Sequence, residues 1–128
     1  MTLELKMLVW SAALALAQML VALLAAITQV GVLRLVGNRE NLPAFEGWAD
    51  RAQRAHRNML ESLGIFAALV LVAQVAGKTN AMTALGAQLF FWARLAYGPV
   101  YIIGIPGLRT ALWGISFVGL LQILIPLL

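Results

Sequence analysis

Long runs of apolar residues, separated by short charged or turn-forming segments, dominate the chain. Residues 7–33 and residues 62–76 carry no charge, and after residue 78 only Arg94 and Arg109 interrupt the uncharged sequence. A membrane-spanning helix needs about 20 predominantly apolar residues. The pattern therefore predicts an all-α membrane protein with four transmembrane helices in an up-down bundle. We expect the first helix over roughly residues 5–35, and a single domain over residues 1–128.

The composition supports this class and removes several others. Hydrophobic residues make up 62% of the 128 residues, compared with roughly 45–50% apolar residues in soluble domains. A secretory signal peptide is the alternative for the N-terminus, but its apolar core is only about 7–15 residues long. The chain has no cysteine and one histidine, which excludes disulfides and a cysteine nucleophile and argues against a metal site.

The basic residues are distributed by topology, so the formal net charge of +4 does not indicate nucleic-acid binding. Those near the first and third connections are Arg34, Arg39, Arg51, Arg54, Arg57 and Arg109. Lys6 and Lys78 fall at the opposite ends of the helices. Because basic residues favour cytoplasmic loops, we expect these two connections in the cytoplasm and both termini outside. The compact length and the lack of a eukaryote-like sorting signal favour a bacterial inner membrane.

A polar stripe follows one face of the second predicted helix. At 100° per residue, its side chains fall within an arc of about 120°; they are Asp50, Arg51, Arg54, Arg57, Asn58 and Glu61. His56 points the opposite way, which favours a subunit contact or headgroup exposure. The third helix carries Arg94, Tyr97 and Tyr101 at i, i+3 and i+7. Arg109 opens the fourth helix, and we expect these polar surfaces to converge in the cytoplasmic half of the bundle.

Two interpretations of this stripe are open. The charges can neutralise one another, through ion pairs of Asp50 with Arg54 and of Glu61 with Arg54 or Arg57. However, the arginines outnumber these acids, and an unpaired charge in a low-dielectric cleft is costly. The surplus therefore favours an anionic ligand, with anionic lipid headgroups as the alternative for some of the arginines.

The same residues resemble the signatures of a known family. Residues 54–61, RAHRNMLE, are similar to the R-A-x-x-N-x-x-E signature of the MAPEG family, the membrane-associated proteins of eicosanoid and glutathione metabolism. Residues 94–101, RLAYGPVY, match the family's R-x-x-[HY]-x-x-x-Y element, and Arg109 matches an arginine near the start of its fourth helix. Residues 38–40 stand where the family has Asn-Pro-Glu, although the proline is missing here.

This resemblance implies a homotrimer of four-helix subunits that holds glutathione between adjacent subunits on the cytoplasmic side. It assigns glutathione binding to Arg54, Arg57, Asn58, Glu61, Arg94, Tyr97 and Tyr101. It also implies that Arg109 lies beside the sulfur, where Arg109 and a hydrogen bond from Tyr101 would favour the thiolate. The implied activity is that of a transferase or peroxidase, which acts on a lipophilic electrophile or a lipid hydroperoxide from the bilayer.

Two other functions compete with this hypothesis. One is a non-catalytic scaffold of the same fold that binds lipids or glutathione, but the full set of signature residues favours the enzyme. The other is a proton-driven drug exporter with Glu61 as the coupling carboxylate, but neighbouring arginines would keep that carboxylate ionised. We interpret the four tryptophans as packing residues and membrane-interface anchors.

Overall fold

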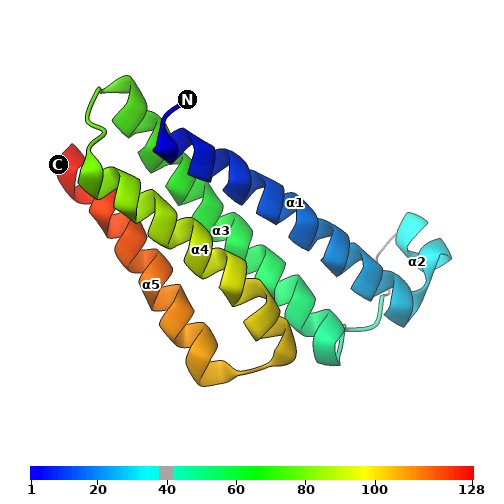
Figure 1. Ribbon diagram of the computed structural model, residues 1–128. Helices are drawn as coiled ribbons and strands as arrows, with labels where there is room; N and C mark the ends of the chain where they lie inside the picture. The colour runs from blue at the N-terminus through cyan, green and yellow to red at the C-terminus, as the bar shows by residue number, and fades with distance from the viewer. Residues whose placement is uncertain (38–41) are drawn as a thin grey trace.

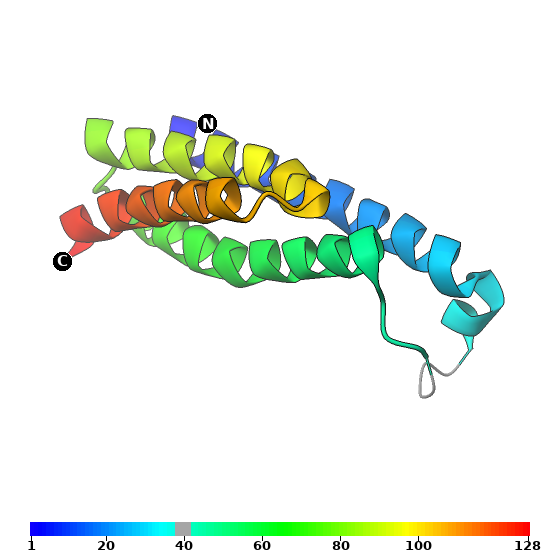
Figure 2. The same ribbon diagram turned by 90° about the horizontal axis from the view of Figure 1, so that it is seen from below.

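The computed structural model describes residues 1–37 and 42–128, and in these ranges it contains helices and no strands. The elements are α1 (Leu3–Val30), α2 (Val32–Val36), α3 (Gly47–Val75), α4 (Ala81–Ile103), α5 (Pro106–Leu124) and the short 3-10 helix η1 (Ile125–Leu127). The four long helices lie side by side and alternate in direction (Figure 1). Both termini and the α3–α4 turn lie at one end, and α2 and the α4–α5 link lie at the other (Figure 2).

Three of the described helices are long and apolar enough to cross a membrane: Leu3–Val30, Gly47–Val75 and Pro106–Leu127. The fourth long helix, α4, has 23 residues and is therefore about 35 Å long, which exceeds the ~30 Å hydrocarbon core of a bilayer. It packs against all three of the others. The predicted bundle of four helices therefore fits the structure.

The first helix differs from the prediction at its C-terminal end. The sequence predicts helix through residue 35, but α1 ends before Gly31 and the chain continues as the separate short helix α2. Gly31 has φ 85° and ψ 160°, a conformation that glycine adopts far more readily than other residues. The break was not predicted because the uncharged run continues through this glycine to residue 33.

Glutamine side chains tie α1 to the start of α3. The Nε2 of Gln29 donates to the carbonyl oxygen of Ala44 at 2.9 Å, and its Oε1 accepts from the backbone amide of Glu46 at 3.0 Å. Nearly two turns into α3, the Nε2 of Gln53 donates to the carbonyl oxygen of Ala22 at 2.8 Å. These bonds fix how α3, which carries the polar stripe, enters the bundle.

The core lies between α3, α4 and the end of α5. The rings of Phe66 and Phe90 stack with their centroids 4.1 Å apart. The buried cluster around them also contains Met59, Val70 and Ile123, together with the alanines Ala15 of α1, Ala73 and Ala87. Because Met59 and Phe90 lie within one turn of Asn58 and Arg94, the same packing holds the polar residues in place.

Candidate functional site

Polar side chains of α3 and α4 line a hollow in the half of the bundle that carries α2 and the α4–α5 link. Its volume is about 350 Å³, and its lining residues are Arg54, Arg57, Asn58, Glu61 and Tyr101. The four from α3 share one helical face because they are spaced by three, four and seven residues. We call this cavity the polar hollow. The structure thus brings together five of the residues selected from the sequence, and their role as ligands stays a prediction.

Arg94 is buried behind the polar hollow. Only 2% of its surface is exposed, and its Nη1 donates a hydrogen bond to Oδ1 of Asn58. Its guanidinium carbon lies 4.8 Å from the centre of the Tyr97 ring and 5.8 Å from that of Phe90. Its Nε has no hydrogen-bond partner among the described residues. Arg94 and the buried Tyr97 therefore support the wall of the hollow, where Asn58 is in direct contact with it.

The start of α5 places a further cation beside Tyr101. Gly104, in the left-handed conformation with φ 93°, ends α4, and α5 begins at Pro106. This short link holds Arg109 close to the last turn of α4, with its guanidinium carbon 4.6 Å from the centre of the Tyr101 ring. The rings of Tyr101 and Tyr97 are 5.6 Å apart. Arg109 is not one of the residues that line the polar hollow, and it reaches the hollow through Tyr101.

The polar stripe contains little ion pairing in the described part of the chain. The one ion pair there joins Nε of Arg54 to Oδ2 of Asp50 at 2.8 Å, and the two side chains are 59% and 32% exposed. This pair is one of those considered from the sequence, although it lies at the surface. The alternative pairs of Glu61, with Arg54 or with Arg57, are not formed. Arg57 and Glu61 therefore present opposite charges at the hollow, without an ion-pair partner among the described residues.

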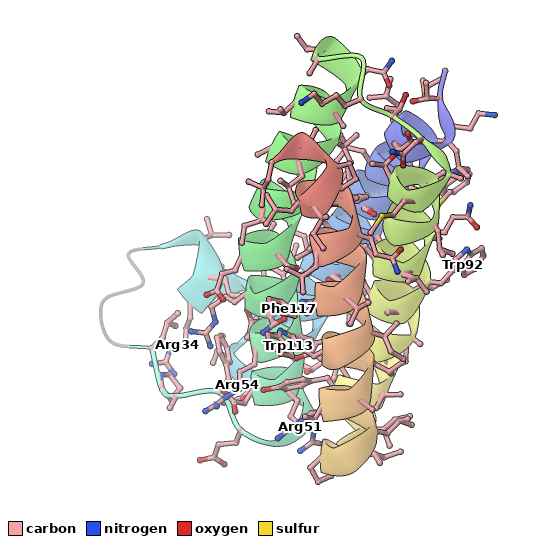
Figure 3. All side chains as sticks on the ribbon, turned by 90° about the vertical axis from the view of Figure 1, so that its left-hand side faces the viewer. Arg34, Arg51, Arg54, Trp92, Trp113 and Phe117 are labelled. Atoms are coloured by element: carbon pink, nitrogen blue, oxygen red, sulfur yellow. The ribbon has the colours of Figure 1, made fainter. Side chains whose placement is uncertain are left out.

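Two neighbouring residues lie outside the hollow. The Nε of Arg51 donates to the carbonyl oxygen of Ile102 at 2.7 Å, so this arginine joins the start of α3 to the end of α4. Arg34, Arg51 and Arg54 lie in the same half of the bundle (Figure 3). His56 is partly exposed and does not line the polar hollow. Its position agrees with the off-face orientation expected from the helical spacing.

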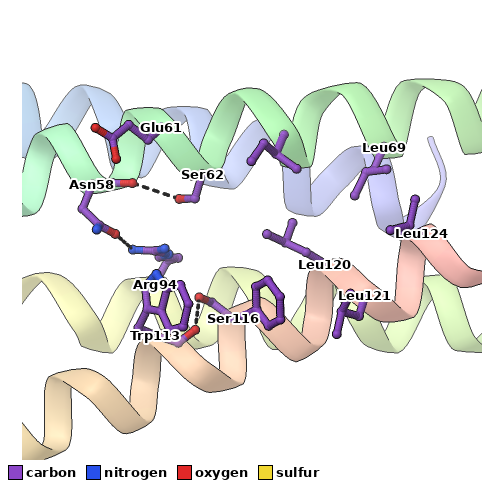
Figure 4. Close-up of a pocket in the computed structure, with 12 residues that line it drawn as sticks. Asn58, Glu61, Ser62, Leu69, Arg94, Trp113, Ser116, Leu120, Leu121 and Leu124 are labelled. Carbon is purple, nitrogen blue, oxygen red and sulfur yellow. Dashed lines mark hydrogen bonds between the residues drawn. The ribbon is translucent and has the colours of Figure 1, made fainter.

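An apolar groove continues from the polar hollow between α3 and α5. Its volume is about 310 Å³, and Asn58 and Glu61 line both spaces. We call it the α3–α5 groove; its other lining residues are Ser62, Ile65, Leu69, Arg94, Trp113, Ser116, Phe117, Leu120, Leu121 and Leu124. Arg94, Asn58 and Glu61 lie toward one end and leucines lie toward the other (Figure 4). The combined space suits a ligand with a polar head next to an apolar body.

Three neighbouring residues of α5 stand out among those lining this groove that were not selected from the sequence: Trp113, Ser116 and Phe117. The rings of Trp113 and Phe117 stack with centroids 5.4 Å apart. The buried Ser116 donates from Oγ to the carbonyl oxygen of Trp113 at 2.7 Å. A signal was present, because Trp113 and Ser116 follow Arg109 at i+4 and i+7 and share its helical face. The interpretation of the tryptophans as anchors obscured it.

The described residues contain no group of three or more His, Cys, Asp or Glu side chains that could hold a metal ion. The sequence matches the model of the MAPEG family over residues 7–128. No similar curated protein and no similar solved structure was found. Residues 38–40, which form part of the family resemblance, lie outside the described residues. Since the match covers essentially the whole chain and agrees with the membrane-spanning helices, this integral membrane protein belongs to the MAPEG family.

Proposed function

We propose that the protein is a glutathione-dependent membrane transferase or peroxidase that binds glutathione in the polar hollow. The observation that carries this proposal is the hollow itself, where Arg57 and Glu61 have no ion-pair partner in the described part of the chain. Unpaired charges on a membrane helix are costly and usually serve a function. Membership of a family of glutathione and eicosanoid metabolism supports the same ligand.

The residues of the hollow fit the groups of glutathione, which has two carboxylates, an ammonium, two peptide groups and a thiol. Arg54 and Arg57 suit the carboxylates, because a guanidinium binds a carboxylate through two parallel hydrogen bonds. Glu61 suits the ammonium. Asn58 already accepts from Arg94 with its oxygen, so its NH₂ group is the part left to donate to a peptide carbonyl. The volume of about 350 Å³ lies within the usual range of ligand pockets.

Bound glutathione would supply the nucleophilic sulfur, which this chain lacks because it has no cysteine. A free thiol has a pKa of about 8.5, and a nearby cation favours its deprotonated form. We assign that role to Arg109, next to Tyr101 as a hydrogen-bond donor. The α3–α5 groove would receive a lipophilic electrophile or a lipid hydroperoxide from the bilayer. In this arrangement the chain would bind and orient glutathione and would lower the free-energy cost of deprotonating its thiol.

We further propose that a homotrimer completes the site. Arg54, Arg57 and Glu61 are exposed in the single chain, on a helix that is long and apolar enough to cross a membrane. Charged groups in such a helix normally face protein or a water-filled cavity, and a neighbouring copy would provide that environment. Native mass spectrometry of the purified protein would give the number of subunits. A monomer that binds glutathione would contradict this part of the proposal.

Isothermal titration calorimetry with glutathione tests the site directly. The Arg57→Ala/Glu61→Ala variant should lose saturable binding, because it removes one cation and one anion from the hollow. Lys78→Ala/Glu46→Ala is the matched control, since it removes one exposed charge of each sign away from the hollow. Equal binding by both variants would contradict the proposal. Binding without turnover of any electrophile or hydroperoxide would favour the non-catalytic scaffold.

The role of Arg109 is tested separately from binding. Arg109→Ala should still bind glutathione but should lose the ultraviolet absorbance of the thiolate and about 10²-fold in turnover, as when one charge-stabilising donor is removed. Arg109→Lys, which keeps the cation, should retain part of both signals. Unchanged turnover in Arg109→Ala would refute the assigned role.

A further inference from the structure

A second groove lies between α1 and α4, and none of its lining residues belongs to the polar hollow or the α3–α5 groove. Its volume is about 490 Å³, and its lining is apolar, with Trp10, Ala13, Ala17, Phe91, Trp92 and Leu95 among the residues. Trp10 and Trp92 are 59% and 60% exposed, and the small alanines leave space between them. Trp92 projects from α4 on a side away from Trp113 and Phe117 (Figure 3). We call this space the α1–α4 groove.

Lys6 is not one of the lining residues, but it lies one helical turn before Trp10, toward the end of the α1–α4 groove nearest the N-terminus. Lys6, Trp10, Ala13 and Ala17 follow one another at i, i+4, i+7 and i+11, which places them within an arc of about 60° on α1. Lys6 is exposed, and no ion pair involves it in the described part of the chain. Glu4 does not neutralise it, because Glu4 is only 4% exposed and its carboxylate accepts from the hydroxyl of Thr83 at 3.1 Å.

The length of the groove matches one leaflet of a bilayer. From Lys6 to Ala17 the helix rises about 16 Å, and half of the ~30 Å hydrocarbon core is about 15 Å. The bond between Glu4 and Thr83 shows that α1 and α4 begin at the same end of the bundle. Lys6 therefore falls at headgroup depth when Ala17 lies near the bilayer centre. The groove fits one lipid of one leaflet and is too short for a ligand that spans both.

We propose that the α1–α4 groove binds one anionic phospholipid, with its phosphate at Lys6 and an acyl chain between Trp10 and Trp92. A lysine near the membrane surface attracts anionic headgroups, and the exposed rings of Trp10 and Trp92 offer an acyl chain a large apolar contact area. The apolar lining of the groove would then contact the acyl chain of the lipid, and Lys6 would contact its phosphate. This site does not depend on the proposed function, because it shares no residue with the polar hollow.

Native mass spectrometry of the detergent-purified full chain tests this proposal, by counting the lipids retained after incubation with phosphatidylglycerol or phosphatidylcholine. Lys6→Gln removes the cation, and Ala13→Leu fills the groove. Lys78→Gln and Ala12→Leu are the matched controls, because both residues are exposed and neither lines the groove. Helical circular dichroism would establish that each variant is folded, and the same mass spectra give its subunit number.

We expect Lys6→Gln to weaken retention of phosphatidylglycerol about fivefold, the effect of one surface lysine, and to leave phosphatidylcholine unaffected. Ala13→Leu should reduce retention of both lipids, and the two controls should match the unmodified chain. The proposal fails when Lys6→Gln behaves like Lys78→Gln, or Ala13→Leu like Ala12→Leu. A changed subunit number in Ala13→Leu, with lipid retention intact, would overturn it in favour of a contact with a second copy.

Discussion

At the scale of single residues, Asn58 joins the buried and the exposed parts of the candidate site. It lines the polar hollow, and its side-chain oxygen accepts from the buried guanidinium of Arg94. In the described part of the chain, Nε of that guanidinium has no hydrogen-bond partner. The hydrogen bond that Arg94 donates to Asn58 therefore compensates in part for burying a charge of α4 inside the bundle. A side chain that lines the proposed binding site therefore also contributes to stability.

We predict that Asn58→Ala lowers the free energy of unfolding by about 1.5–3 kcal/mol, the range for hydrogen bonds to charged groups. The loss arises because Arg94 keeps its charge but loses its acceptor. Denaturant titration in detergent micelles would measure it. Arg54→Ala is the control, since its ion pair with Asp50 is exposed and such pairs contribute about 0–1 kcal/mol.

A double-mutant cycle checks the cause of that loss. When Asn58→Ala is combined with Arg94→Met, the buried charge disappears with its acceptor, so the combined cost should be smaller than the sum of the two single costs. Additive costs would show that the two residues stabilise the protein independently. A cost for Asn58→Ala no greater than that for Arg54→Ala would contradict the prediction outright.

At the scale of elements, a close approach of two glycines sets the packing of α4 against α5. A Cβ atom added to Gly86 would lie 2.5 Å from the carbonyl oxygen of Gly119, and one added to Gly119 would lie 2.6 Å from that of Gly86. Backbone atoms cannot move aside as a flexible side chain can. The helices therefore meet closely only because both positions lack a side chain. This crossing also fixes α5, which lines the α3–α5 groove.

We predict that Gly86→Ala and Gly119→Ala each destabilise the bundle by about 1–3 kcal/mol, the usual cost of overpacking. Gly114→Ala is the matched control, because a Cβ there meets nothing within 4 Å. It should be neutral or stabilising by up to about 1 kcal/mol, the helix propensity difference between alanine and glycine. The same unfolding titration compares the three variants. Equal effects of all three would show that the close approach has no energetic importance.

The elements also show which features could be predicted from sequence. Long uncharged runs predicted the four helices because lipid permits little else, and 100° spacing predicted the face shared by Asn58 and Glu61. Gly31 ended α1 without a charged residue or a proline to mark the break. Arg51 was expected within the charged stripe, but it bonds the carbonyl oxygen of Ile102. That acceptor belongs to the backbone of another helix, so only tertiary packing defines the contact.

At the scale of the whole molecule, the described arginines that the sequence places near the first and third connections lie at one end of the bundle. Arg51, Arg57 and Arg109 lie in the half of the bundle with α2 and the α4–α5 link. Both termini and the turn that contains Lys78 lie at the opposite end (Figure 1). The positive-inside rule then predicts that the arginine-rich end faces the cytoplasm. The candidate glutathione site would then open toward the cytoplasm, and glutathione would enter it from that side.

The absence of cysteine makes this orientation directly measurable. Lys78→Cys and Gly107→Cys place one thiol at each end of α4, at exposed positions where the added Cβ of residue 107 meets nothing within 4 Å. We predict that a membrane-impermeant maleimide labels Lys78→Cys in right-side-out vesicles and Gly107→Cys only in inside-out vesicles. The unmodified chain, which cannot react, is the control. Reversed labelling would refute the orientation. Labelling of both from one side would show that α4, which is not among the three described helices found long and apolar enough to span a membrane, does not cross the membrane.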